Sequence, residues 1–294
     1  MRAESGRNGT NVYRRADLRG RTGVYRRKAL WIASVLFLGG ILLTGLLAPW
    51  LVPHNPNQVD VLQKFQSPSW SYPLGTDHLG RCIFSRLLDA VRYSFGGALL
   101  VLALTLSIGI AAGSLTALKG GWLDAVFMRI CDILLAFPTL VLAFVLLGML
   151  GPGFGNLLLA LVLSMWVYYA RTVRSLVLSM REKPFIQAAI VCGTRSWGLL
   201  FKHIVPNLMQ PLLVMSTLEL GGIILEITGF SFLGLGVQAP QAEWGMMISD
   251  GKSYIRLHPE LMLYPGLAIM VIVMVSNRLG ESFRAYFETG GRNL

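Results

Sequence analysis

The sequence predicts an all-α integral membrane protein with six transmembrane helices. Of its 294 residues, 54% are hydrophobic and only 14% are charged, whereas soluble domains carry about 25% charged residues. Several long runs contain no charge at all. Segments of about 10 residues with alternating polarity, which mark a membrane barrel, are missing. Since only helices and closed barrels satisfy the backbone in lipid, helices remain.

The charge-free runs locate the helices. They cover Ala29–Val52, Tyr93–Leu118 and Ile133–Ala170. One crossing needs about 20 residues, so the last run is long enough for two, with a turn at Pro152 and Gly153. Two further apolar stretches follow. We therefore expect a transmembrane domain over residues 29–294, with spans at about 29–52, 93–118, 133–151, 155–173, 209–236 and 261–278.

The basic residues predict the orientation. With six spans, all but six of the 26 Lys and Arg residues fall on the side of the N-terminus. The positive-inside rule then places both termini in the cytoplasm. Residues 1–28 are expected to form a basic, disordered cytoplasmic tail. The first span is longer than the apolar region of a signal peptide, so we expect a retained anchor. The net charge of +11 is thus explained by the excess of basic residues on the cytoplasmic side, and no nucleic-acid partner is expected.

No chemistry of its own is predicted for the chain. Gly251-Lys252-Ser253 looks like the end of a phosphate-binding loop, but Met246 stands where that motif needs glycine. Neither G-x-S-x-G nor H-E-x-x-H occurs, and the four histidines lack ligand spacing. We expect no catalytic residue, no metal site and no bound cofactor. Any energy for transport then has to come from another chain.

Two carboxylates, Glu219 and Glu226, fall within the fifth span. Seven residues turn a helix by about 700°, so the two share one face and lie about 10.5 Å apart along the axis. A charge at mid-bilayer costs at least about 2.5 kcal/mol. Either carboxylate could therefore line a water-filled path that favours cationic or amine-bearing solutes. The alternative is structural: pairing with Arg or Ser on a neighbouring helix, or a place near the interface.

The longest cytoplasmic connection covers residues 177–207. Its first part, Lys183–Cys192, is compatible with a short helix, and Gly193 permits a bend. We expect Pro206 to end the second segment, and hence a helix–glycine–helix elbow over Lys183–Pro206. The alternative is an amphipathic helix lying on lipid. Apolar residues recur at helical spacing in the second segment: Trp197, Leu200, Phe201 and Ile204.

This connection resembles the EAA loop of the membrane permease subunits of ATP-binding-cassette importers. That signature reads E-A-A, three residues, G, nine residues, I, one residue and L-P. The spacing from the first Ala to the Pro is the same here, and Gln187, His203 and Val205 replace the usual Glu, Ile and Leu. The resemblance implies that the loop docks in a cleft of an ATPase subunit. The coupling residues that it implies are Gln187, Ala188, Ala189, Gly193, His203 and Pro206.

Three more stretches are similar to the dipeptide, oligopeptide and nickel permease group: Leu74–Leu88, Phe230–Ile248 and Tyr264–Arg284. Cys82 stands where the group usually has the last Asp of G-T-D-x-x-G-R-D. The resemblance implies a type I importer permease fold in the bacterial inner membrane. It also implies a heterodimer with a second, homologous permease, ATPase subunits that use ATP, and an extracytoplasmic solute-binding protein.

The predicted function is therefore that of a permease subunit working by alternating access, with membrane lipid around it. Met165–Met180 is closer to the nickel and metal-chelate branch, which favours nickel or a metal chelate as the solute. A dipeptide or oligopeptide importer is the alternative. An intramembrane enzyme would need more chemistry than two carboxylates, and a passive channel would not need the elbow.

Overall fold

The computed structural model describes residues 32–290, with side chains for residues 32–285. Apart from an isolated β-bridge between Thr76 and Cys82, this part of the chain consists of helices and their connections, as predicted. The expected tail at 1–28 lies outside the described residues. Five of the described helices are long and apolar enough to cross a membrane: Ile32–Leu51, Ile83–Lys119, Phe154–Arg181, Ser196–Phe232 and Glu260–Ala285.

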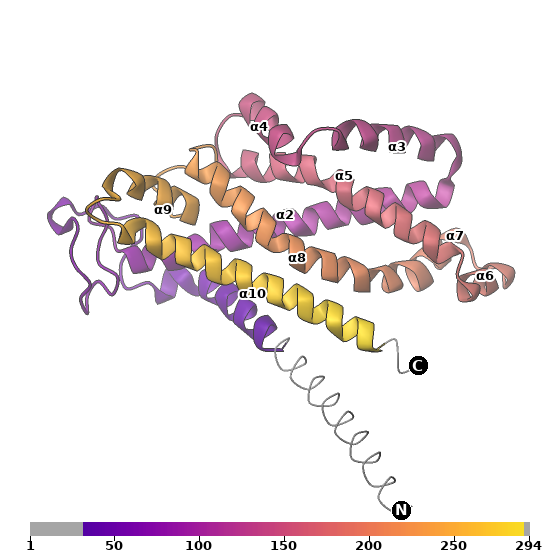
Figure 1. Ribbon diagram of the computed structural model, residues 1–294, viewed down its shortest axis with the longest axis horizontal. Helices are drawn as coiled ribbons and strands as arrows, with labels where there is room; N and C mark the ends of the chain where they lie inside the picture. Colours follow the sequence, from indigo (N-terminus) through magenta and orange to yellow (C-terminus); the bar gives the residue numbers. More distant parts are fainter. Residues whose placement is uncertain (1–31, 291–294) are drawn as a thin grey trace, which may run out of the picture.

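The long helices run side by side along the longest axis of the molecule (Figure 1). They are α2 (Ile83–Lys119), α5 (Phe154–Arg181), α8 (Val205–Phe232) and α10 (Glu260–Gly290), with the helix Ile32–Leu51 beside them.

Short elements gather at the two ends. One end, here named the cap, comprises residues 52–82 and 233–259, with η1 (Val61–Gln63), α9 (Trp244–Gly251) and η3 (Lys252–Tyr254). The opposite end is the elbow, with α6 (Pro184–Val191), α7 (Ser196–Leu199) and η2 (Leu200–Ile204).

The expected third span at 133–151 differs from the structure. Its residues are divided between α3 (Gly121–Leu135) and α4 (Thr139–Leu150), which meet at an angle of 87°. Taken as one broken span, the pair would be the sixth crossing. The break has a local cause: Pro138 lacks an N–H group for the helix, and a residue before proline is biased away from helical geometry.

The helix that contains the second expected span begins ten residues before that span, at Ile83 rather than near residue 93. Its first turns hold Arg86, Asp89 and Arg92, which the charge-free criterion excluded. Arg92 pairs with Asp89 one turn away, at 3.1 Å, and Arg86 is fully enclosed by the cap. A helix can therefore extend through charged residues when those residues are paired, although hydropathy alone would predict that it ends before them.

α2 and α5 pack closely together at two glycines of α2. A Cβ atom on Gly113 would overlap the carbonyl oxygen of Ala170, and one on Gly109 would lie 2.6 Å from the Cβ atom of Tyr169. Small residues four apart let helix backbones approach each other, and in lipid such contact is a main source of association. These glycines therefore fix the distance between α2 and α5.

Replacing Gly113→Ala should destabilise the fold by about 1–3 kcal/mol, because the added methyl group overlaps backbone atoms that cannot move independently. The matched control is Gly148→Ala in α4, where an added Cβ meets nothing within 4 Å. Thermal unfolding of the detergent-solubilised protein should show a lower midpoint for the first variant only. Equal midpoints for Gly113→Ala and the wild type would contradict this packing argument.

Candidate functional site

The elbow is fixed to the bundle by one side of its first helix. α6 begins at Pro184, where a missing N–H group costs nothing, and Ile186 is fully buried. Gly193 follows α6 with a φ of 81°, a conformation that side chains disfavour. The bend predicted at this glycine is therefore confirmed. The residues around Ile186 form a small core at this end: Ala117, Val173, Val177, Leu199, Leu200, Ile204, Leu208 and Leu212.

The elbow also exposes large apolar side chains. Val191 is 86% exposed, and the stacked rings of Trp197 and Phe201, 5.9 Å apart, are 60% and 64% exposed. Isolated exposed apolar residues are ordinary, but a group of them marks an interaction surface. We name this group the elbow patch: Phe185, Ile190, Val191, Trp197 and Phe201.

The predicted coupling residues lie on or beside this surface. Gln187 and Ala188 are exposed on α6, and Ala189 is half-buried. The Gln187 amide donates a 2.7 Å hydrogen bond to the carbonyl of Arg181, whose guanidinium donates to the carbonyl of Ala117 at the end of α2. A carboxylate at 187 could not donate this bond. The amide that departs from the usual Glu therefore ties the elbow to its own bundle.

The prediction that Pro206 ends the second segment is wrong. The chain stays helical from Ser196 to Phe232, with a π-helical turn at Leu200–Ile204, and Pro206 stands exposed in the first turn of α8. Proline has no N–H group to donate the regular hydrogen bond of an α-helix. The π-turn just before Pro206 changes the hydrogen-bonding pattern, so the helix continues through the proline. His203, half-buried, lies within this turn.

Glu219 and Glu226 both lie on the continuous helix α8, on the shared face that their spacing predicts, and both are half-buried. Neither forms an ion pair with a described residue. One oxygen of Glu226 is buried and has no hydrogen-bond partner within residues 32–285. Of the structural alternatives, pairing with Arg or Ser on a neighbouring helix thus finds no support within residues 32–285, whereas a place near the interface remains an alternative.

Glu226 lines a pocket of about 390 Å³ between α4 and α8. The rest of its wall is apolar: Leu140 and Phe144 of α4, and Leu225, Gly229, Phe230, Phe232 and Leu233 at the end of α8. Pockets that bind small molecules in proteins begin at about 300 Å³, so a small solute would fit. This pocket could not be anticipated from the sequence, because α4 reaches α8 only through the bend after α3.

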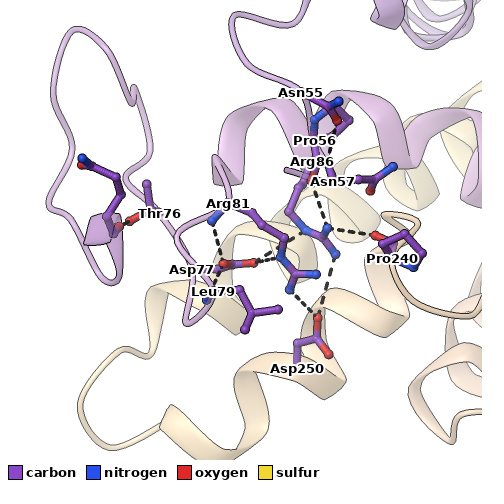
Figure 2. A network of polar contacts seen from close by, with 11 residues as sticks. Asn55, Pro56, Asn57, Thr76, Asp77, Leu79, Arg81, Arg86, Pro240 and Asp250 are labelled. Atoms are coloured by element: carbon purple, nitrogen blue, oxygen red, sulfur yellow. Dashed lines mark hydrogen bonds and ion pairs between the residues drawn. The ribbon is translucent and has the colours of Figure 1, made fainter. Parts of the chain in front are cut away.

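The cap is held together by a buried charge network that the sequence did not reveal. Figure 2 shows Asp77 beside Arg81 and Arg86, with Asp250 of α9 completing the group. Arg81 donates to Asp77 at 2.6 Å and to Asp250 at 2.9 Å, while Arg86 donates to the carbonyls of Pro56 and Pro240 at 3.1 and 3.2 Å. Two separate stretches of chain are thereby joined to the start of α2.

A second anchor joins α9 to α2. Glu243 caps the N-terminus of α9, accepts a 2.7 Å hydrogen bond from Ser94 and is fully buried. Burial raises the pKa of the Glu243 carboxyl, while its hydrogen bonds act in the opposite direction. The indole of Trp244 donates to the carbonyl of Leu87. α9 is therefore held against α2 from two sides.

A signal for the network was present in the G-T-D-x-x-G-R stretch, which contains both Asp77 and Arg81. His78 lies within this stretch, stacked on Tyr254, and burial lowers the pKa of its imidazole. Cys82, which replaces the usual Asp, precedes α2 without forming a side-chain cap. What the sequence could not supply was the partner of these residues far along the chain, on α9.

Replacing Arg86→Met should destabilise the protein by about 3–5 kcal/mol, because it leaves the carbonyls of Pro56 and Pro240 without their donor and removes a buried positive charge 3.8–3.9 Å from Asp77 and Asp250. Arg278→Met is the matched control, since its ion pair with Glu281 is exposed and such pairs contribute little. Thermal unfolding and proteolysis of the cap give the readout. A cap that stays protease-resistant in Arg86→Met would contradict the network's role.

Within the described part of the chain, no group of three or more His, Cys, Asp or Glu side chains is arranged to hold a metal ion. The described residues combine exposed apolar side chains at the elbow, two carboxylates on one face of α8 and buried charges in the cap.

Comparison with known proteins agrees with this arrangement. Residues 91–291 match the family described as "Binding-protein-dependent transport system inner membrane component". The nickel transport system permease protein NikC of Escherichia coli K12 is 40% identical over 255 residues, which cover 87% of this chain and 92% of that protein.

Two other relatives are named for different solutes. The metal-staphylopine import system permease protein CntC of Staphylococcus aureus is 38% identical, over 85% of this chain and 88% of that protein. The dipeptide transport system permease protein DppC of Alkalihalophilus pseudofirmus is 36% identical, over 88% of this chain and 85% of that protein. The chain therefore belongs to the family of inner-membrane permease components of binding-protein-dependent transport systems.

Proposed function

We propose that this chain is one permease of an ATP-driven importer and forms half of the path for nickel or a metal chelate. A second, homologous permease supplies the other half, ATPase subunits supply the energy, and an extracytoplasmic binding protein delivers the solute. Both termini and the elbow lie in the cytoplasm, so the cap faces outward. The positive-inside bias of the sequence supports this orientation.

The elbow patch is the observation that carries the proposal. Its apolar residues surround the positions whose spacing matches the EAA loop, and Ile186 fixes α6 to the bundle from behind. A surface that is anchored to the bundle and exposes apolar side chains suits a partner that binds there and transmits a conformational change to the helices. Docking of an ATPase here would explain why the sequence contains no ATP-binding motif of its own.

The solute is inferred from the relatives. The names of two of them, at 40% and 38% identity, specify nickel and a metal–staphylopine complex. A dipeptide permease follows at 36% identity and supports the peptide alternative. The carboxylates of α8, which form no ion pair among the described residues, favour a solute with positive charge. A metal complex and the amino group of a peptide both meet that requirement.

An importer is favoured over the other two classes. An intramembrane enzyme would need several reacting groups together, whereas the described spans bring together two carboxylates on one helix face. A passive channel would need no exposed apolar surface at the end of the bundle. The elbow patch therefore favours a coupled transporter.

The substitution Val191→Asp should reduce recovery of the ATPase with the purified permease about tenfold, because a charge would be desolvated at the centre of the patch. Leu62→Asp is the matched control: Leu62 is 91% exposed, but it lies in the cap. The measurement is copurification from detergent extracts of cells that express the whole system. Undiminished recovery with Val191→Asp would argue against docking at the elbow.

The solute can be tested in cells that express this permease with the proteins encoded beside it. We expect accumulation of radioactive nickel to exceed that of the same cells carrying Val191→Asp by at least about tenfold, in proportion to the lost docking. A labelled dipeptide tested in parallel should show no such difference. Dipeptide accumulation without nickel accumulation would select the peptide alternative.

A further inference from the structure

The pocket around Glu226 has a composition that selects one kind of ligand. Three phenylalanines line it, Phe144, Phe230 and Phe232, and Glu226 contributes the single carboxylate. Ring faces attract cations by about 0.5–2 kcal/mol each, depending on desolvation. A carboxylate attracts them more strongly where water is scarce. Aromatic faces and one anionic oxygen together favour an organic cation.

We propose that this pocket is a subsite of the transport path at which Glu226 receives a positively charged N–H group of the passing solute. The inference rests on the proposed function, since it assumes that a solute moves along α8. Glu226 lies six residues before the end of α8 at Phe232, hence about 9 Å from the cap end of that helix. A solute released at the cap meets this pocket before it reaches Glu219.

A bare metal ion fits the pocket poorly. Divalent cations in oxygen or nitrogen sites need several ligands around them, and the other residues of this wall are leucine, phenylalanine and glycine. An ammonium group, or an amine bound to a metal, carries its positive charge on N–H bonds. Such a group can donate one N–H bond to Glu226 while its carbon atoms lie against the apolar wall.

The chain leaves room for this ligand at a specific position. Gly229 follows Glu226 by about one helical turn, and a Cβ atom there would meet nothing within 4 Å. Phe144 and Phe230 contact each other across the two helices, with ring centroids 4.7 Å apart. The pocket is therefore walled by a fixed ring pair and open above the glycine.

One basic residue of the cap lies near this wall. The Lys252 ammonium lies over the ring of Phe232, 5.8 Å from its centroid. Lys252 forms no ion pair with Glu226 within 4.0 Å. The carboxylate thus remains available, although Lys252 is the competitor that a test has to include.

The test uses thiol labelling in the importer complex isolated with its partner chains in lipid nanodiscs. Cys192, the exposed natural cysteine, is first replaced by Ser. Gly229→Cys then places a thiol at the mouth of the pocket, and Gly40→Cys places one on the first helix, also in open space. Each is labelled with an aminoethyl and with a sulfonatoethyl methanethiosulfonate, of which the first carries a positive charge on N–H bonds and the second a negative charge.

We expect the ratio of cationic to anionic labelling rates at position 229 to exceed the ratio at position 40 by about tenfold, which corresponds to about 1.4 kcal/mol. Adding Glu226→Gln should remove most of this excess. Equal ratios at the two positions would overturn the proposal, as would an excess that persists in Glu226→Gln. An excess that arises only with Lys252→Gln would also overturn it, because Glu226 would then serve Lys252.

The labelling readout is independent of ATPase docking. If Val191→Asp fails to release the ATPase but the labelling ratios behave as expected, docking at the elbow falls and the preference of the pocket for cations stands. If docking behaves as proposed and the ratios are equal, the subsite alone falls.

Discussion

The structure depends on how closely α2 can approach α5. In lipid, apolar surface gives helices no strong reason to associate, so direct packing has to do it. Gly109 and Gly113 make that packing possible, and α2 continues for 37 residues, or about 55 Å, without a break. Its first turns carry the cap through Ser94, and its last turn receives the elbow through Ala117. One helix pair thus connects the cap with the elbow, where we propose that the ATPase docks.

The helical class and most spans could be predicted because hydropathy is a local property. Runs of residues without charge locate the spans, and Pro152 and Gly153 within one of these runs locate a turn. The start of α2 was missed because Arg86 is satisfied by the carbonyls of Pro56 and Pro240, and Asp250 lies within 3.9 Å of it. No window of sequence contains those partners. Hydropathy therefore fails to predict a helix start when its charged residues are paired with residues far away in the sequence.

The same limit explains the candidate site. The bend at Gly193 follows from one residue and was predicted, whereas the helix through Pro206 depends on a π-turn whose hydrogen bonds differ from the regular ladder. The 87° angle between α3 and α4 was missed as well. α3 carries Asp124, which pairs with Arg174 of α5 at 2.5 Å. That ion pair helps to hold α3 along α5, and α4 then turns back over α8.

The carboxylates of the chain divide into two groups by their partners. Asp77 and Asp250 meet arginines in the cap, Asp124 meets Arg174, and Glu243 accepts hydrogen bonds from Ser94 and the backbone. Each of these holds two elements together. Glu226 has a buried oxygen with no partner among the described residues, although an unpaired polar atom in such surroundings costs free energy. Because none is supplied by residues 32–285, the partner of Glu226 is expected from outside, and the open pocket beside Gly229 is where it can enter.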